Sequence, residues 1–273
     1  MVEPKTVSKG PAIGDNGTVP TDNESLSRVP VLDLLPHVCD LDSVMRRIDE
    51  LIGARRGGYI CLSTVHMVME SYDDPEFADK VNSAEIVIPD GMPLVWLQKL
   101  RGHRSARRIR GNDLMKGLIR YSAEKDLKVG FYGGSSDVVE AMRERVEREY
   151  PHLKLVYACA PPFRLVTDAE DVAIVDEINR ADPDLLFVGI GCPKQENWMA
   201  AHRGRIRALM FGVGAAFDFY AGNVREAPVW LRNVGFEWFF RLSRDPRRLW
   251  KRYLVLNPRF VWHAARQLLG RSR

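Results

Sequence analysis

Short apolar runs alternate with stretches of helical periodicity along most of the chain. Runs typical of buried strands occupy residues 59–63, 85–90, 128–132, 154–158, 185–190 and 208–213. Helical periodicity occupies residues 41–54, 74–82, 94–100, 112–125, 136–150, 168–180 and 193–202. Strands that alternate with helices at this pitch favour right-handed βαβ crossovers and a parallel sheet. The pattern therefore predicts an α/β fold, a Rossmann-like, mostly parallel sheet with flanking helices.

The two ends of the chain depart from this pattern. Residues 1–29 contain several glycines, prolines and asparagines and little apolar material, which predicts a disordered tail without the apolar core of a signal peptide. Residues 30–224 carry the α/β pattern. Residues 225–273 show helical pattern only, broken near Asp245-Pro246 and Asn257-Pro258, so we expect two or three short helices in a C-terminal helical appendage.

The small net charge of +4 conceals an uneven distribution. From residue 225 onward, eleven arginines and one lysine stand against three acidic residues, which gives +9 and leaves about −5 for the rest of the chain. Four of the six tryptophans lie in the same segment: Trp230, Trp238, Trp250 and Trp262. Cations and tryptophan concentrated at one end favour contact with a polyanionic surface. Bilayer headgroups and nucleic acid are both candidates, although no nucleic-acid-binding motif accompanies the charge.

Neither a membrane span nor a disulfide framework is predicted. No segment offers the ~18 uninterrupted apolar residues that are needed to cross a bilayer. The four cysteines (Cys39, Cys61, Cys159 and Cys192) are scattered, without a CxxC pair or a histidine at metal-ligand spacing. Reduced thiols in the cytosol are therefore expected.

Asp90 lies at a strand-to-loop junction, because Pro89 and Gly91 mark the end of an apolar run. Open α/β sheets bind their ligands just beyond the carboxyl ends of their strands, so a carboxylate at this position can act as a general base. The alternative is that Asp90 only caps the following helix.

Three predicted strands run into glycine: at Gly133-Gly134, at Gly189-Ile190-Gly191 and at Gly212-Val213-Gly214. Glycine lets backbone amides approach a phosphate closely, and the following helix directs its positive end at the anion. Glycines also simply end strands in many α/β folds, so each loop by itself is a weak signal. The GxxxxGK[ST] motif of phosphoryl transfer and the GxGxxG dinucleotide fingerprint are both missing, which disfavours a P-loop enzyme and a dehydrogenase.

Two polar residues follow strands at the same predicted edge of the sheet. Gln195, in Pro193-Lys194-Gln195-Glu196, opens a helix and can direct its amide into a cleft to contact a sugar hydroxyl or a base edge. Asp218 follows the last strand and can accept hydrogen bonds from a ribose. Taken singly, each is also an ordinary residue of a helix start.

The basic segment near residue 245 contains Arg241, Arg244 and Arg248 at helical spacing, with Lys251 and Arg252 one turn further. Its opposite side carries Trp238, Phe239, Leu242 and Leu249. This pattern is typical of a helix in a membrane interface, or of one that docks on the α/β domain with its arginines turned to a diphosphate. An ordinary amphipathic helix with a solvated basic face is the alternative.

These motifs, taken in order, resemble the WecG/TagA/CpsF family of bacterial glycosyltransferases over residues 30–265. The array comprises Thr64 after a strand, Pro89-Asp90-Gly91, Arg110-Gly111-Asn112-Asp113-Leu114, Gly133-Gly134, Gly191-Cys192-Pro193-Lys194-Gln195-Glu196, Gly212-Val213-Gly214-Ala215-Ala216-Phe217-Asp218 and Ala221-Gly222. The resemblance implies inverting transfer of a sugar, often N-acetylmannosamine, from a UDP-sugar to a polyprenyl-diphosphate-linked saccharide. It places the reaction at the inner face of the cytoplasmic membrane, in the synthesis of teichoic acid, enterobacterial common antigen, capsule or exopolysaccharide.

The resemblance also assigns roles by motif. Asp90 corresponds to the general base, and Thr64, Gln195 and Asp218 correspond to donor-contacting positions. From the same motifs we expect substrate contacts at Arg110, Asp113, Gly133, Gly134 and Gly214. The appendage is expected to close over the site at the membrane, with Arg241 and Arg248 stabilising the departing diphosphate and Arg252 binding substrate.

Two departures from the family pattern concern the donor. The family commonly shows Thr-x-Asn after its first core strand, whereas this chain has Thr64-Val65-His66. Cys192 stands where serine is frequent. His66 is therefore a substrate-binding candidate that either does the asparagine's work or selects a different sugar.

No metal or other cofactor is expected. Metal-dependent transferases commonly use Asp-x-Asp, and Asp182-Pro183-Asp184 has that spacing. It precedes a strand, at the end opposite the expected cleft, so a plain turn is the favoured interpretation. A noncatalytic nucleotide-sugar-binding or scaffold protein remains the alternative function, and the family's tendency to self-associate leaves a homo-oligomer open.

Overall fold

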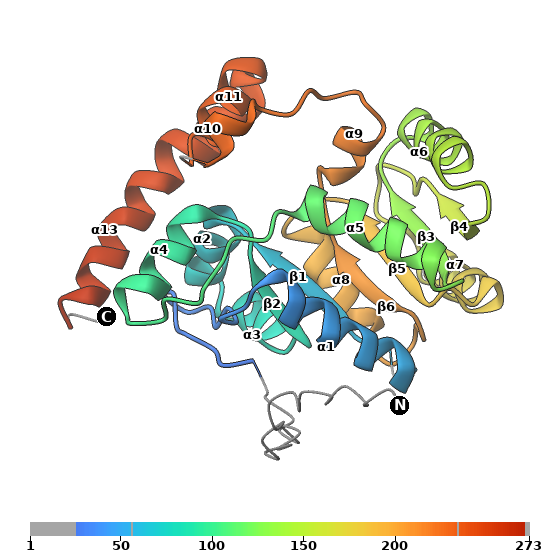
Figure 1. Cartoon of the computed structure of the whole chain (residues 1–273), viewed down its shortest axis with the longest axis horizontal. Coiled ribbons are helices and arrows are strands. Elements are labelled where there is room, and N and C mark those ends of the chain that lie inside the picture. Colours follow the sequence, from blue (N-terminus) through green and yellow to red (C-terminus); the bar gives the residue numbers. More distant parts are fainter. Residues whose placement is uncertain (1–25, 56, 234, 271–273) are drawn as a thin grey trace, which may run out of the picture.

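The computed structural model describes residues 26–55, 57–233 and 235–270. Its centre is a six-stranded sheet of β1 (Tyr59–Ser63), β2 (Ile86–Pro89), β3 (Lys128–Gly133), β4 (Lys154–Cys159), β5 (Leu185–Gly189) and β6 (Leu209–Gly212). The strand order is β2-β1-β6-β5-β3-β4, and every neighbouring pair is parallel (Figure 1). The predicted fold class is confirmed.

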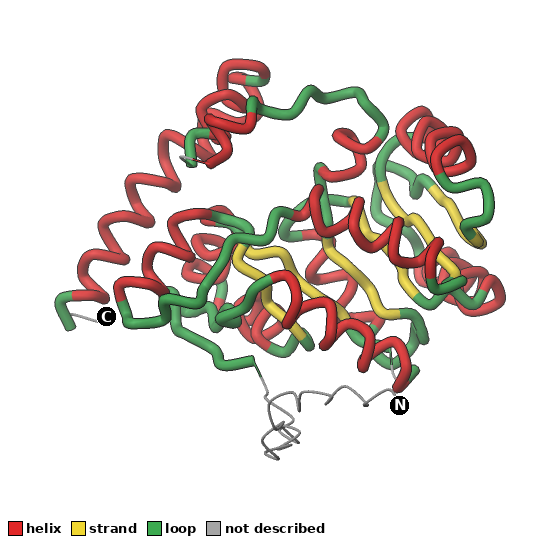
Figure 2. The backbone as a smooth tube through the Cα atoms, in the orientation of Figure 1, coloured by secondary structure: helices red, strands yellow, loops and turns green. Residues whose placement is uncertain are grey.

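Helices cover both faces of this sheet (Figure 2). On one face lie α1 (Leu41–Ala54), α5 (Gly111–Glu124), α6 (Ser136–Glu149) and α9 (Ala216–Tyr220). The other face packs against α2 (Val65–Asp73), α3 (Pro75–Asn82), α4 (Met92–Leu100), α7 (Asp168–Ala181) and α8 (Lys194–His202). Successive strand residues such as Ile60 and Cys61 enter opposite layers, and both are fully buried. Two-sided burial explains why the strands read as continuous apolar runs.

Two helices of the α/β domain, α2 and the short α9, were missing from the predicted helical ranges. α2 begins directly after β1, and the Thr64 side chain caps it by accepting a hydrogen bond from the Met67 amide at 3.4 Å. Val65, Val68 and Met69 are buried. A threonine followed by these apolar residues is the sequence signal that could have revealed the helix. The other predicted elements up to residue 213 agree with the structure to within two residues at each end.

The chain paths after β3 and β5 diverge at the carboxyl edge of the sheet. β3 connects outward to β4, whereas β5 connects in the opposite direction to β6. Such a reversal leaves a crevice beyond the strand ends, where ligands of open α/β sheets bind. The strands approach very closely here, because a Cβ on Gly133 would lie 2.5 Å from the Gly189 carbonyl carbon.

The folded part begins slightly earlier than the predicted boundary at residue 30. Val29 is buried and its amide donates to the Pro36 carbonyl at 3.0 Å. Arg28 donates from Nε to His37 Nε2 at 3.0 Å. The last residues of the predicted disordered tail are therefore ordered, while residues 1–25 lie outside the described part of the chain.

The C-terminal appendage contains α10 (Val229–Asn233), α11 (Glu237–Arg244), α12 (Pro246–Trp250), a π-helical turn η1 (Lys251–Val255) and α13 (Leu256–Leu268). The predicted break at Asp245-Pro246 is confirmed, since Asp245 ends α11. The predicted break at Asn257-Pro258 is wrong. Pro258 stands in the first turn of α13, where a helix tolerates a missing backbone N–H.

The long helix α13 docks the appendage onto α2 (Figure 1). Phe260 and Ala264 are buried in the same apolar cluster as α2. Arg259 pairs with Asp73 through both guanidinium nitrogens, one of them at 2.6 Å. In contrast, α11 has no buried residue. No helix among the described residues combines the length and the apolar character needed to cross a bilayer.

Candidate active site

A cavity of about 1550 Å³ opens at the carboxyl ends of the strands, with walls from both the α/β domain and the appendage. Ten of the predicted site residues line it: Thr64, His66, Asp90, Arg110, Gly134, Gln195, Gly214, Asp218, Arg241 and Arg252. Two do not. The Asp113 carboxylate is 54% exposed and pairs with Arg110, while Gly133 serves the close contact between β3 and β5. The Arg248 side chain lies outside the described residues.

Asp90 occupies the loop after β2 and projects toward the start of α5. Its amide donates to the Ser63 carbonyl at 2.8 Å, and its Oδ2 accepts from the Gly111 amide at 3.4 Å. The predicted alternative, a cap on the following helix, is wrong. Gly91 is the N-cap of α4, and that helix receives no side-chain cap. The positive end of α5 instead faces the carboxylate, which stabilises its charge.

Burial raises the pKa of Asp90, even though two cations stand close by. The Arg108 guanidinium, 3.5 Å from Oδ1, lowers the pKa, and the carboxylate of Glu237 raises it again. The net result is a pKa above the ordinary value for aspartate. A higher pKa makes the ionised carboxylate a stronger base, and its 22% exposure to the cavity leaves it accessible to a substrate hydroxyl.

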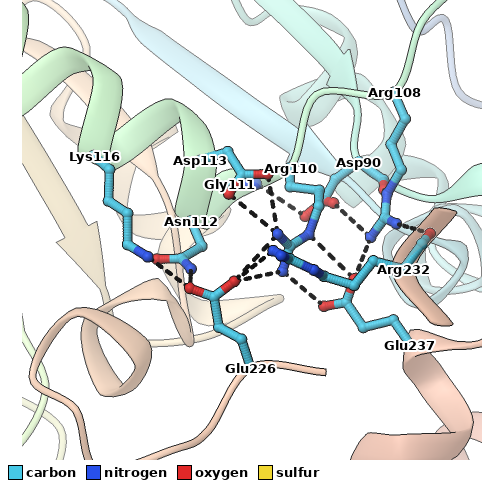
Figure 3. A network of polar contacts seen from close by, with 10 residues as sticks. All are labelled: Asp90, Arg108, Arg110, Gly111, Asn112, Asp113, Lys116, Glu226, Arg232 and Glu237. Atoms are coloured by element: carbon cyan, nitrogen blue, oxygen red, sulfur yellow. Dashed lines mark hydrogen bonds and ion pairs between the residues drawn. The ribbon is translucent and has the colours of Figure 1, made fainter. Parts of the chain in front are cut away.

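A network of ion pairs joins this region to the appendage (Figure 3). Glu237, at the start of α11, accepts from Arg108 Nη2 at 2.8 Å and from Arg110 Nε at 3.2 Å. Burial by itself would raise the pKa of Glu237, but Arg108 and Arg110 hold it below its ordinary value. Glu237 is therefore an ionised carboxylate fixed between two cations.

A second appendage carboxylate, Glu226, extends the network along α5 (Figure 3). Glu226 accepts from Lys116 at 2.6 Å, from Asn112 at 2.7 Å and from Arg232 at 2.7 Å. Arg110 lies 3.4 Å from the same carboxylate. Arg110 thus lines the cavity, but its guanidinium is engaged by Glu226, Glu237 and Asp113.

Two appendage arginines, Arg241 and Arg252, line the cavity and, unlike Arg110, are not engaged by carboxylates among the described residues. Arg252 donates from Nη2 to the Thr64 hydroxyl at 3.2 Å, and Arg241 lies over the Phe219 ring at 5.5 Å. Among the described residues, neither guanidinium forms an ion pair with a carboxylate. Burial, together with the neighbouring Arg241, lowers the pKa of Arg252. A desolvated cation without a counter-charge favours binding of an anion.

The predicted one-sided stripe of Arg241, Arg244 and Arg248 does not form, because the helix breaks between α11 and α12. Arg241 lines the cavity, whereas Arg244 is exposed and lies 5.4 Å from the Phe240 ring. Spacing along one uninterrupted helix therefore did not predict which arginines face the site.

His66 stands next to Arg252 at the start of α2. Its Nε2 lies 3.1 Å from the Glu70 carboxylate, and its Nδ1 has no hydrogen-bond partner among the described residues. Burial and the positive charge of Arg252 lower the pKa of His66 to about 4. The imidazole is therefore neutral near pH 7, and the facing carboxylate favours the tautomer with its proton on Nε2.

Gln195 is held at the floor of the cavity by its own loop. Its Oε1 accepts from the Gly191 amide at 3.2 Å, and its Nε2 donates to Glu196 Oε1 at 2.7 Å. Gly214 approaches from the other side with φ of 51°, and a Cβ there would lie 3.5 Å from Gln195 Oε1. Glu196 is fully buried, and burial raises its pKa to about 7.

The backbone around this floor is suited to an anion. Ser135 caps α6 at the cavity wall, and α2, α5 and α8 also begin there. Several helix N-termini directed at one space create a positive potential without a formal charge. Asp218, on α9 across from this floor, also lines the cavity.

Asp182 and Asp184 lie at the opposite edge of the sheet, as predicted. Asp182 ends α7 and pairs with Lys128 at 2.9 Å, while Asp184 accepts from the Lys128 amide at 2.8 Å. In the part of the chain that the structure describes, no three histidine, cysteine or acidic side chains are arranged to hold a metal ion.

Four residues of this site were not predicted as functional: Glu70, Arg108, Glu196 and Glu237. Glu237 carried a usable signal, since it is one of three acidic residues in a segment that is otherwise strongly basic. Arg108 lies in a run of arginines in which nothing in the sequence distinguishes it. Glu70 pairs with His66 at i,i+4 spacing on α2, the helix that was not predicted, while Glu196 adjoins Gln195 and only its burial required the folded chain.

Comparisons with known proteins show the family to which the chain belongs. The profile of the family described as "Glycosyl transferase WecG/TagA/CpsF family" matches residues 29–273. The N-acetylglucosaminyldiphosphoundecaprenol N-acetyl-beta-D-mannosaminyltransferase of Bacillus subtilis strain 168 is 34% identical over 213 residues, which cover 77% of this chain and 78% of that protein. The protein of the same name from Bacillus spizizenii is 32% identical over 76% of this chain and 78% of its own length. Its counterpart in Staphylococcus aureus strain MW2 is 30% identical over 63% of this chain and 66% of its own length.

Proposed function

Because the chain belongs to the WecG/TagA/CpsF family of glycosyl transferases, we propose that it transfers N-acetylmannosamine or a related hexose from a UDP-sugar to a polyprenyl-diphosphate-linked saccharide. The names of its relatives specify an N-acetylglucosaminyldiphosphoundecaprenol acceptor and an N-acetylmannosaminyl group. The observation that carries the proposal is a single cavity lined by Asp90, a carboxylate with a raised pKa, and by Arg241 and Arg252, two arginines with no carboxylate partner among the described residues.

Asp90 supplies the base of an inverting displacement. The acceptor hydroxyl attacks the anomeric carbon of the donor from the face opposite UDP, and Asp90 takes its proton as the new glycosidic bond forms. The carbon–oxygen bond to UDP breaks at the same time, and its electron pair leaves on the diphosphate. A base in this position supplies about 10²–10⁴-fold in rate.

The departing diphosphate gains negative charge, which the site can neutralise from two sides. Arg241 and Arg252 come from the appendage, while the N-termini of α6 and α8 come from the strand-end loops. Arg252 is already oriented by Thr64 at 3.2 Å. Positive groups fixed before the reaction stabilise the transition state without reorganisation at the moment of bond breaking.

We propose residues 30–224 as the catalytic α/β domain and residues 225–273 as an appendage that contacts an anionic membrane surface at the inner face of the cytoplasmic membrane. The appendage exposes large apolar side chains, among them Trp230 at 67% and Trp262 at 64%. Its net charge is +9. Tryptophan and arginine together are typical of segments that lie in the headgroup region.

The deciding experiment measures UDP release from a panel of UDP-sugars, with and without a short-chain polyprenyl-diphosphate-GlcNAc acceptor and with EDTA throughout. Acceptor-dependent release from one donor is the expected result, and it would identify the sugar. If release appears only when Mg²⁺ replaces EDTA, the expected metal independence is wrong. UDP binding without release under either condition would favour the alternative, a noncatalytic nucleotide-sugar-binding protein.

Membrane contact is tested separately by co-sedimentation with anionic and neutral liposomes, beside binding to heparin and RNA at the same salt concentration. We expect binding to the anionic liposomes and weaker binding to both polyanions. Equal or tighter binding to RNA would contradict the membrane assignment.

A further inference from the structure

We propose that Glu196 is a positioning residue for donor binding, because it holds the side-chain amide of Gln195 in one orientation at the floor of the cavity. The inference rests on the proposed function, since the ligand concerned is the UDP-sugar. Glu196 itself has no exposed surface and does not line the cavity. It therefore acts through Gln195 and not by touching the substrate.

The orientation of the Gln195 amide follows from its two partners. The Gly191 amide can only donate, so the group 3.2 Å from it must be the Gln195 oxygen. The other end of the amide is therefore Nε2, which donates to Glu196 Oε1 at 2.7 Å, and this contact needs only an Oε1 that carries no proton. These contacts leave one lone pair of Oε1 and one hydrogen of Nε2 for a ligand.

The surrounding packing gives this arrangement little freedom. A Cβ on Gly212 would lie 3.1 Å from Gln195 Nε2 and 2.6 Å from the Met199 side chain. Gly191 and Gly214, which flank Oε1, belong to the loops that follow β5 and β6. The Gln195 amide thus lies between the loops that follow β5 and β6, with its oxygen bonded to Gly191 of the first loop and its nitrogen bonded to Glu196.

Among the contacts that lower the pKa of Glu196, that with Gln195 comes first, ahead of its own backbone amide and the Cys192 thiol. The charged and titratable groups that face it are Arg252 from η1, Cys192 from its own loop and Cys61 from β1. Its Oε2 has no hydrogen-bond partner among the described residues. A buried carboxyl group in this setting is costly to the fold, which is difficult to explain if its only role is packing.

The test compares two substitutions in two backgrounds. Glu196→Leu removes the acceptor, whereas Glu196→Gln keeps an amide oxygen that can still accept from Nε2. Each is made in the natural chain and in a Gln195→Ala chain. KM for UDP-N-acetylmannosamine and kcat are measured by acceptor-dependent UDP release, and folding is checked by thermal melting.

We expect Glu196→Leu to raise KM about tenfold, the usual effect of losing a hydrogen bond to a charged group, with kcat changed less. Glu196→Gln should recover most of that loss. In the Gln195→Ala background neither substitution should raise KM further, because the residue through which Glu196 acts is already gone.

Equal increases in KM in both backgrounds would overturn the inference, since Glu196 would then act independently of Gln195. An unchanged KM in both Glu196 variants would overturn it as well. If Glu196→Leu does not fold, the comparison of Glu196→Gln across the two backgrounds gives the same decision. A natural chain that transfers no sugar from any donor would instead contradict the proposed function, and this inference would fall with it.

Discussion

The two walls of the cavity are held in place by different kinds of interaction. On the side of the α/β domain, Asp90 and Gln195 follow buried parallel strands and are positioned by backbone hydrogen bonds, such as that from the Asp90 amide to Ser63. On the side of the appendage, Arg241 lies in a helix with no buried residue. The appendage reaches this position through α13, packed on α2, and through ion pairs of Glu226 and Glu237.

The difference indicates a division of labour. The α/β wall is built directly on the parallel sheet, which suits the roles proposed for Asp90 as base and for Gln195 as a donor-contacting amide. The appendage wall is attached around Glu226 and Glu237 largely by ion pairs, and a ligand that competes for their arginines would weaken this attachment. We expect the donor side of the site to be preformed and the diphosphate side to depend on how the appendage is held.

The largest loss of activity is expected from replacing Asp90, the proposed base on the α/β wall. Asp90→Asn keeps the shape of the α/β wall but cannot accept the acceptor proton, so kcat should fall by about 10³-fold. UDP affinity, measured by calorimetry, should change little. Asp126→Asn, at an exposed carboxylate that pairs with Lys154, is the matched control. An Asp90→Asn enzyme that works at full rate would rule out Asp90 as the base.

The largest effect expected on the appendage wall comes from Arg252. Arg252→Ala removes a half-buried cation that Thr64 orients, and we expect kcat to fall by about 10²-fold because the leaving diphosphate loses one fixed positive group. UDP affinity should also weaken, unlike in Asp90→Asn. Arg120→Ala, which removes an exposed arginine on α5, is the control. If Arg252→Ala retains both kcat and UDP affinity, the diphosphate is stabilised elsewhere.

Glu196, on the side of the α/β domain, should make the stability of the folded chain depend on pH. Its pKa in the folded chain is about 7, above the ordinary 4.5, chiefly because of burial. The folded state therefore binds this proton more tightly than the unfolded state. The stability so gained is fully present below pH 4.5 and is lost as the pH rises toward 7, by about 3 kcal/mol.

Glu196→Gln removes this titration. The free energy of unfolding, measured by urea titration at pH 5 and pH 8, should fall less with rising pH in Glu196→Gln than in the natural chain. Glu140→Gln, at an exposed carboxylate on α6, should leave the pH dependence unchanged. Identical pH profiles for Glu196→Gln and the natural chain would mean that the buried carboxyl group is not perturbed in this way.

The smallest effect is expected at the junction between the two walls. Glu237→Gln replaces a carboxylate that joins Arg108 and Arg110. This change should weaken the docking of α10 and α11 on the α/β domain by about 1.5 kcal/mol. Hydrogen exchange should quicken in residues 229–244, and transfer should slow by about tenfold or less. Exchange in β1, β5 and β6 should stay as it was. Faster exchange throughout the sheet would show that the appendage is part of the core and not a separately held wall.

Residues immediately after predicted strands were the easiest to place in advance. Asp90, Gln195 and Asp218 are far apart in the sequence, yet they line one cavity because the strands before them are parallel and end at the same edge. The predictions for the appendage failed where they depended on how its helices begin, end and pack. The stripe of arginines assumed one continuous helix, but the structure has a break at Asp245 and a continuous passage through Pro258.

The sequence alone determined the order of the six strands and of most helices along the chain, the edge of the sheet at which the cavity opens, and the family. These features depend on local periodicity, on turn residues and on the fixed direction of parallel crossovers, all of which are visible in the chain itself. The tertiary structure decided which charges meet: Arg108 with Asp90, Glu237 with two arginines, and Glu196 with Gln195. Such pairings join distant segments, or require burial that no local pattern specifies, so only the packed fold could establish them.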